Sequence, residues 1–231
     1  MPADMPWRSM RLASRLARGR AFDLTVEGLD AVPRAGPVVI AAHHHHHLYD
    51  GAALTLAIER PSHIVAALDW ISKPAGRALM EQLCAQARWP VVDRIPDGER
   101  PTRESTRTLL QSMRSVTRLL EEGRVVVIFP EGFPNIDPGI TPKSDDLPFL
   151  PFKAGFIRFA AHAARTAGPI PIVPAGFSYR RDDRWAITLR FGEVLTVTPG
   201  TDLSAATSEI ERRVRALSPI PARPSSAGRH P

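Results

Sequence analysis

The sequence is poor in cysteine and in long apolar runs. Its 231 residues contain one cysteine, Cys84, so an internal disulfide is excluded and no cysteine cluster suggests a structural zinc site. The longest apolar runs, Val38–Ala42 and Val125–Phe129, have the length of buried strands and fall far short of the roughly 20 residues that span a bilayer. No continuous apolar stretch follows the basic N-terminus, which argues against a secretory signal. We therefore expect a cytoplasmic protein that is soluble or lies on a membrane surface.

Lysine is also scarce, and the central part of the chain has no charge excess. Three lysines stand beside 27 arginines, and the formal net charge is +6. Residues 1–20 hold five arginines and one acid, residues 201–231 hold five arginines and three acids, and the rest is balanced. This distribution argues against a nucleic-acid-binding domain with a broad basic face. It is compatible with terminal arms that contact an anionic membrane.

The length suits one domain with a full hydrophobic core. Hydrophobic patterns and turn residues predict alternating strands and helices, which is typical of an α/β sheet covered on both faces. Strands are expected at Phe22–Glu27, Val38–Ala42, Ile64–Ala67, Pro90–Val92, Val125–Phe129, Ile170–Pro174 and Ala186–Phe191. Helices are expected at Asp50–Arg60, Ala75–Gln86, Arg103–Glu122, Gly155–Ala167 and Leu203–Leu217. We assign this single domain to residues 21–217.

Two arms flank the domain. Residues 1–20 place Trp7, Met10, Leu12 and Leu16 at helical intervals among arginines. This pattern predicts a basic amphipathic helix, which either lies in a membrane interface or packs on the domain surface. Residues 218–231 are rich in proline and serine and are expected to be a disordered tail.

Five consecutive histidines, His43–His47, connect a predicted buried strand to a predicted helix that begins at Asp50. Ligand and catalytic groups of open α/β folds gather at such strand ends. A histidine in this turn can meet Asp50, and the carboxylate would then fix one imidazole tautomer while the other ring nitrogen takes a proton from an alcohol. Two alternatives stay open at this point: the histidines could bind a metal ion, or Asp50 could be only a helix N-cap.

Two further segments carry polar groups at strand or helix ends. Phe129-Pro130-Glu131-Gly132 follows an apolar strand, and its turn would direct Glu131 toward the strand-end cleft. Lys153 lies in Phe152-Lys153-Ala154-Gly155, at the start of a predicted helix. Each motif is common, and neither defines a function when it is taken alone.

The order of these segments resembles the PlsC-like lysophosphatidic acid acyltransferase family. The resemblance covers about residues 22–195 and rests on motifs in the family's order and at similar spacings. These are His45-x-x-x-x-Asp50, Val91-Val92-Asp93-Arg94, Phe129–Gly132, Phe152–Gly155 and Ile172-Val173-Pro174-Ala175-Gly176. It implies a glycerolipid acyltransferase-like α/β domain with a mixed central sheet flanked by helices.

The resemblance also implies roles for individual residues. His45 would be the general base and Asp50 its partner, Arg94 would hold an acceptor phosphate, and Glu131 with Gly132 would line the acceptor site. Lys153 is included among the substrate-binding residues, and Pro174 would lie on the acyl-donor side. The implied reaction moves a fatty acyl group from acyl-CoA or an acyl carrier protein to a hydroxyl of a glycerolipid-type acceptor. It needs no metal and no further cofactor.

The sequence departs from the family pattern around the phosphate-binding motifs. Phe133-Pro134-Asn135 follows Gly132 where many members have Thr-Arg-Ser. His44 replaces the usual asparagine before the catalytic histidine, and His47 replaces the usual serine. These changes weaken the prediction of a lysophosphatidate acceptor and leave the His–Asp pair intact. A metal-dependent hydrolase built on His43–His47 and a non-catalytic lipid-binding protein on the same scaffold are the competing readings.

Overall fold

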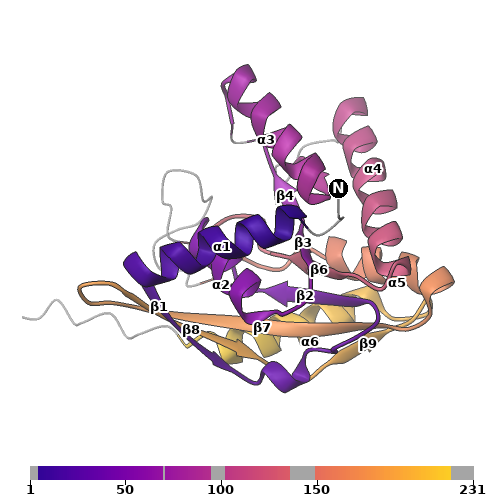
Figure 1. Ribbon diagram of the computed structural model, residues 1–231. Coiled ribbons are helices and arrows are strands. Elements are labelled where there is room, and N and C mark those ends of the chain that lie inside the picture. Colours follow the sequence, from indigo (N-terminus) through magenta and orange to yellow (C-terminus); the bar gives the residue numbers. More distant parts are fainter. Residues whose placement is uncertain (1–4, 70, 95–101, 136–148, 220–231) are drawn as a thin grey trace, which may run out of the picture.

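A computed structural model describes residues 5–69, 71–94, 102–135 and 149–219 (Figure 1). The described chain forms a mixed seven-stranded sheet with helices on both faces, as the sequence predicted. The strand order is β1-β8-β7-β2-β6-β3, and β9 also pairs with β7. The strands are β1 Phe22–Glu27, β2 Val38–Ala42, β3 Ser62–Ile64, β6 Val125–Ile128, β7 Ile170–Arg181, β8 Trp185–Phe191 and β9 Leu195–Val197. A separate parallel pair consists of β4 Ala66–Ala67 and β5 Val91–Val92.

The central strand β2 separates two apolar cores because its side chains alternate between the sheet faces. Val39 and Ala41 join the core formed with α4, α5 and α6, whereas Val38, Ile40 and Ala42 join the core on the face of α2. The helices are α1 Met5–Arg20, α2 Tyr49–Ala57, α3 Pro74–Ala87, α4 Arg103–Glu121, α5 Gly155–Ala167 and α6 Leu203–Leu217, with a short 3-10 helix η1 at Leu29–Ala31. β2 is buried on both faces and pairs in parallel with β6 and β7. Its C-terminal end therefore lies in the middle of one edge of the sheet, between the ends of its neighbours.

The strands differ from the sequence prediction in three places. The single strand expected at Ile64–Ala67 is divided into β3 and β4, which belong to different sheets. β7 continues to Arg181, beyond the expected end at Pro174, because Ala175–Arg181 pairs antiparallel with β8. The short strand β9 was not predicted; it pairs antiparallel with the start of β7. The sheet is mixed because of these two antiparallel pairings, while β1, β2, β3 and β6 pair in parallel with their neighbours.

The N-terminal arm is a helix that packs on the domain. α1 contacts α2, α3 and β1, and the Arg11 guanidinium donates to the main-chain oxygen of Ile58 at 3.2 Å. None of the described helices is long and apolar enough to cross a membrane. At the other end, Ser218 is buried and its hydroxyl accepts from the Phe177 amide at 3.1 Å, so the packed domain extends past the predicted boundary. Residues 220–231, the remainder of the predicted disordered tail, lie outside the described residues.

Candidate active site

Two turns meet at the C-terminal ends of the neighbouring parallel strands β2 and β6. The first turn contains the histidine run and the second contains Glu131 and Gly132. The Asn135 main-chain amide donates to the His44 oxygen at 2.8 Å, which joins the two turns directly. Gly132 has a φ of 78°, a left-handed conformation that favours glycine, and its amide closes the second turn onto Phe129 at 3.0 Å. The sheet therefore brings the first and third sequence motifs together.

Asp50 is the centre of the first turn. Its side chain is fully buried in the first turn of α2, which begins at Tyr49 with Leu48 as the N-cap. The helix thus starts one residue earlier than predicted, and Asp50 is not its N-cap. Instead, the carboxylate points back to the strand end. Its Oδ2 atom accepts from the His44 ring at 2.9 Å and from the main-chain amides of His45 and His46 at 2.7 and 2.9 Å.

The imidazole that bonds to Asp50 belongs to His44, and the predicted base, His45, reaches the carboxylate through its main chain. The His44 Nδ1 atom faces the Asp50 Oδ2 atom, and Nε2 is the ring nitrogen that does not contact this carboxylate. The His44 ring stacks on Phe129 with 4.2 Å between centroids. The His45 ring stacks on Tyr179 with 4.3 Å between centroids and is only partly buried. The His44 ring therefore contacts the Asp50 carboxylate, while the His45 ring contacts Tyr179.

Tyr179 completes the surroundings of Asp50. Its hydroxyl donates a short hydrogen bond to the Asp50 Oδ1 atom. Burial and the adjacent Asp50 carboxylate raise the pKa of Tyr179, so the phenol stays protonated and remains a donor. Sequence reasoning missed this residue, because its place depends on the continuation of β7 past Gly176. An alternating apolar pattern in Phe177–Tyr179 was the only available signal.

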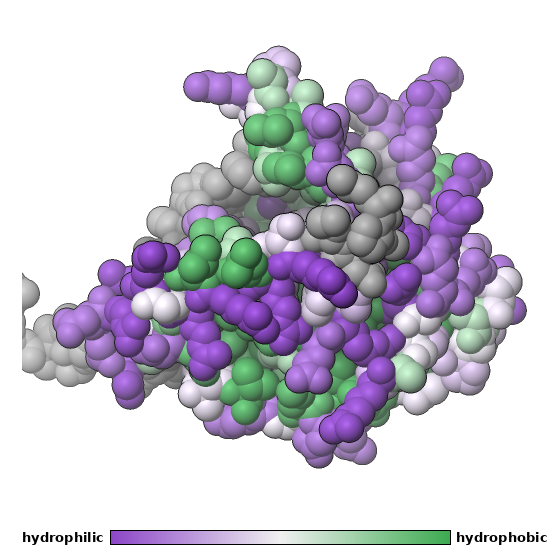
Figure 2. Space-filling model, in the orientation of Figure 1, coloured by the Kyte–Doolittle hydropathy of each residue, from purple (hydrophilic) through white to green (hydrophobic). Residues whose placement is uncertain are grey.

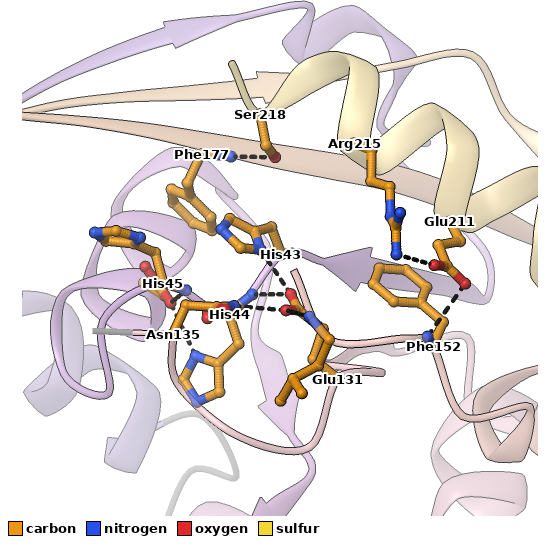
Figure 3. Close-up of polar contacts among 12 residues, drawn as sticks. His43, His44, His45, Glu131, Asn135, Phe152, Phe177, Glu211, Arg215 and Ser218 are labelled. Atoms are coloured by element: carbon orange, nitrogen blue, oxygen red, sulfur yellow. Dashed lines mark hydrogen bonds and ion pairs between the residues drawn. The ribbon is translucent and has the colours of Figure 1, made fainter. Parts of the chain in front are cut away.

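Glu131 forms a buried clamp between the turns. Its side chain is fully enclosed, and Oε1 accepts from the His43 ring at 2.6 Å and from the His44 amide at 2.9 Å. Oε2 accepts from the Asn135 side chain at 2.5 Å and from the Leu150 amide at 3.1 Å. Figure 3 shows the labelled His43, His44 and Asn135 around Glu131. Burial acts to raise the pKa of Glu131, but the hydrogen bond and charge of His43 outweigh it, so the pKa is lowered.

This clamp changes the interpretation of the third motif. Each carboxylate oxygen of Glu131 already has two donors, which fills its acceptor capacity. A bound acceptor would have to displace one of them to touch the carboxylate. Glu131 therefore acts on the site by holding the histidine turn. Asn135, which replaces a family serine, belongs to the same network.

Arg94 lies beside the second turn and already has partners. Its Nε donates to Asp69 at 2.8 Å, Nη1 donates to the Gly132 oxygen at 3.0 Å, and its guanidinium lies over the Phe133 ring at 3.9 Å. Phe133 stands where many family members have threonine, and here it packs against Arg94. The structure thus joins the second and third motifs, with the Arg94 charge balanced by Asp69.

The other two predicted site residues, Lys153 and Pro174, contact the segments that carry the two turns. Lys153 is exposed, and its main-chain amide donates to the Pro130 oxygen at 3.0 Å. Pro174 is buried in β7 opposite Ala41 of β2, and its oxygen accepts from Gly192 at 2.9 Å. Pro174 therefore lies in the sheet next to the end of β2, from which the histidine turn starts.

The His46 and His47 rings stack with 4.7 Å between centroids, while the other histidine rings face different groups. The His43 and His44 rings face different carboxylates, and the His46 ring accepts from the Leu48 amide at 3.2 Å. Burial, followed by the nearby His47, lowers the pKa of His46, which suits a neutral accepting ring. Across the described ranges, no three His, Cys, Asp or Glu side chains form a group that could hold a metal ion.

Comparison with known proteins defines the class to which this fold and site belong. A family model described as acyltransferase matches residues 23–178, and the chain belongs to this acyltransferase family. Among solved structures, the chain is similar to the 1-acyl-sn-glycerophosphate (LPA) acyltransferase PlsC from Thermotoga maritima. The TM-score is 0.61 at 17% identity, with 91% of this chain and 78% of that chain covered. A comparison with curated proteins gives no match.

Proposed function

We propose that this acyltransferase moves a fatty acyl group from an acyl-CoA or acyl carrier protein thioester to a hydroxyl of a glycerolipid-type acceptor. The observation that supports this most is the buried Asp50, which holds one histidine ring and two histidine amides at the central strand end. The similarity to a structure named as an LPA acyltransferase supports the acceptor class. Because Asp69 already pairs with the Arg94 guanidinium, we do not restrict the acceptor to lysophosphatidate. The proposal covers a lysophospholipid or a related acceptor.

The proposed reaction is a direct transfer. A histidine of the turn removes the proton from the acceptor hydroxyl, and that oxygen attacks the thioester carbonyl. The carbon–sulfur bond then breaks, and the leaving thiolate takes the proton back from the imidazolium. Asp50 orients the imidazole and stabilises its charged form. Because a thiolate leaves readily, general-base catalysis and positioning are sufficient, and the proposal needs no metal or other cofactor.

His45 is the proposed base because the four residues between it and Asp50 match the family motif. His44 is the competing base because its ring bonds to Asp50. The variants His45→Ala, His44→Ala and Asp50→Asn distinguish the two assignments. Their initial rates of acyl transfer from acyl-CoA are measured. Loss of the base should lower kcat by about 10²–10⁴-fold, while exposed His47→Ala should leave it near the wild-type value.

The outcomes of this experiment are distinct. A large loss in His45→Ala with a small loss in His44→Ala supports the proposed pair, and the reverse moves the base to His44. Near-normal transfer in both variants would show that neither His44 nor His45 is the base. Mass spectrometry of the lipid products from mixed acyl-CoAs and candidate acceptors identifies the substrates.

We also propose peripheral contact with a membrane, on the inner face of the cell membrane, through α1 and α3. Leu12 and Leu16 of α1 are 59% and 54% exposed, and Leu79 and Leu83 of α3 are 58% and 48% exposed. Figure 2 shows hydrophobic areas over both helices on one face of the molecule, with hydrophilic side chains around them. The two helices are in contact. An exposed apolar face bordered by arginines fits an anionic lipid surface, where an acyl acceptor would be found.

A further inference from the structure

Helix α4 carries a row of four arginines that the proposed reaction does not use. Arg103, Arg107, Arg114 and Arg118 are separated by four, seven and four residues. At 100° per residue these positions fall within an arc of about 60°, and they extend along about 22 Å of the helix. All four are exposed. We call these four residues the α4 arginine row.

The row lies on a helix that projects from the domain. The buried residues of α4 are Ser112, Val116, Leu119 and Leu120, all in its C-terminal half. Figure 1 shows the other end of α4 rising away from the sheet beside α3. The N-terminal half therefore forms a helix without burying side chains in the core. Arg103 and Arg107, in this half, are accessible to a large partner.

The row is not neutralised within the part of the chain that is described. In those ranges no carboxylate forms an ion pair with any of its four guanidinium groups, whereas Arg88, Arg190 and Arg213 each pair with a glutamate. The sequence places like charges four residues apart twice, which disfavours the helix. Arg103 also lies in the first turn, where the helix dipole disfavours a cation. Arg118 lies in the last turn, where the dipole favours a cation, so helix stability accounts for Arg118 but not for the other three arginines. Binding to an extended anionic surface would account for all four.

We propose that the α4 arginine row is a docking site for an acidic carrier protein that delivers the acyl thioester; this rests on the proposed function. The row is charged along its length, so it complements an acidic protein surface. α4 also exposes two leucines, Leu109 and Leu110, between Arg107 and Arg114. The leucine face suited to a lipid surface lies on α1 and α3 instead. Four aligned guanidinium groups over this length exceed what a single phosphate needs. Complementary charge of this kind raises the association rate and falls with ionic strength.

The test measures binding of a purified, unacylated acyl carrier protein to the full chain by isothermal titration calorimetry at low and high salt. The variant Arg107→Glu/Arg114→Glu should raise Kd by about tenfold or more and reduce its salt dependence. The matched control is Arg8→Glu/Arg15→Glu, which makes the same charge change at exposed positions of α1. It should keep the wild-type Kd. Circular dichroism checks that both variants are folded.

Two results would overturn the proposal: no binding by the wild-type chain, or an equal loss in the row and control variants. It would also fall if the row variant lost binding to anionic phospholipid vesicles but kept its affinity for the carrier protein. Acyl transfer from acyl-CoA, measured in parallel, should be unchanged in the row variant. If the wild type transfers an acyl group from neither acyl-CoA nor acylated carrier protein, the proposed function fails independently of the binding result.

Discussion

At the scale of single residues, Asp50 combines a structural and a chemical task. Its carboxylate holds His44, His45, His46 and Tyr179 at once. Because two of these contacts are to main-chain amides, the shape of the turn depends on the same group that orients the proposed base. Loss of activity in Asp50→Asn must therefore be compared with the stability of that variant before it is assigned to catalysis.

Glu131 gives a prediction for stability. Replacement by Gln puts an amide donor where every partner is also a donor, which should destabilise the fold by about 1–3 kcal/mol at neutral pH. The pKa of Glu131 is lowered in the folded chain from its ordinary 4.5, so its contribution is present above that pH and is lost as pH falls below it. Wild type and Glu131→Gln should thus converge in stability toward acid pH. Urea unfolding at several pH values measures this.

The control for that prediction is Glu59→Gln, at an exposed glutamate. Its unfolding free energy should stay close to the wild type at every pH. If Glu131→Gln instead ran parallel to the wild type down to acid pH, the buried clamp would not be ionised in the folded chain.

Sequence reasoning reached this site only in part. Spacing and family resemblance identified Asp50 and the histidine run, because those signals are local. The ring contact of His44 could not be predicted, since it depends on α2 beginning at Tyr49 and on Asp50 pointing back to β2. The partners Tyr179 and Asn135 come from distant segments with no spacing signal. The prediction that His45 is the base stays a prediction.

At the scale of elements, patterns of hydrophobic residues predicted the buried strands and most helices because burial imposes a regular period on them. The predicted end of β7 at Pro174 was wrong because proline and glycine, as in Pro174-Ala175-Gly176, usually mark the end of a strand. In the sheet, Pro174 and Gly176 are accommodated, and Gly176 faces α6 closely. A Cβ atom at position 176 would lie 2.5 Å from the main-chain carbon of Leu217.

Gly176→Ala should therefore force α6 away from β7. We expect a destabilisation of about 1–3 kcal/mol from this overpacking, measured by thermal or urea unfolding. Gly155→Ala is the matched control, because a Cβ there meets no atom within 4 Å and alanine favours the helix. Equal stability of the two variants would contradict the close contact between Gly176 and the end of α6.

At the scale of the whole molecule, the proposed membrane contact depends on two helices that are distant in sequence. The variant Leu12→Gln/Leu16→Gln/Leu79→Gln/Leu83→Gln should reduce co-sedimentation with anionic phospholipid vesicles by about tenfold or more, since it removes exposed apolar area from one face. Leu29→Gln, at a leucine exposed on η1, should have no effect. Unchanged vesicle binding in the four-leucine variant would remove α1 and α3 as the contact surface.

The pairing of β1 with β8 has a consequence for biosynthesis. Phe22 lies opposite Trp185 in the parallel register. β1, the first strand to be synthesised, therefore cannot pair until β8 has been synthesised. At 5–20 residues per second, translation delays this pairing by on the order of ten seconds. During that time the strand is open to pairing with other chains, and Asp23 and Glu27 within it place charges that oppose such contacts. We expect these two acids to disfavour such contacts until β8 is made, when Asp23 and Glu27 pair with Arg184 and Arg190.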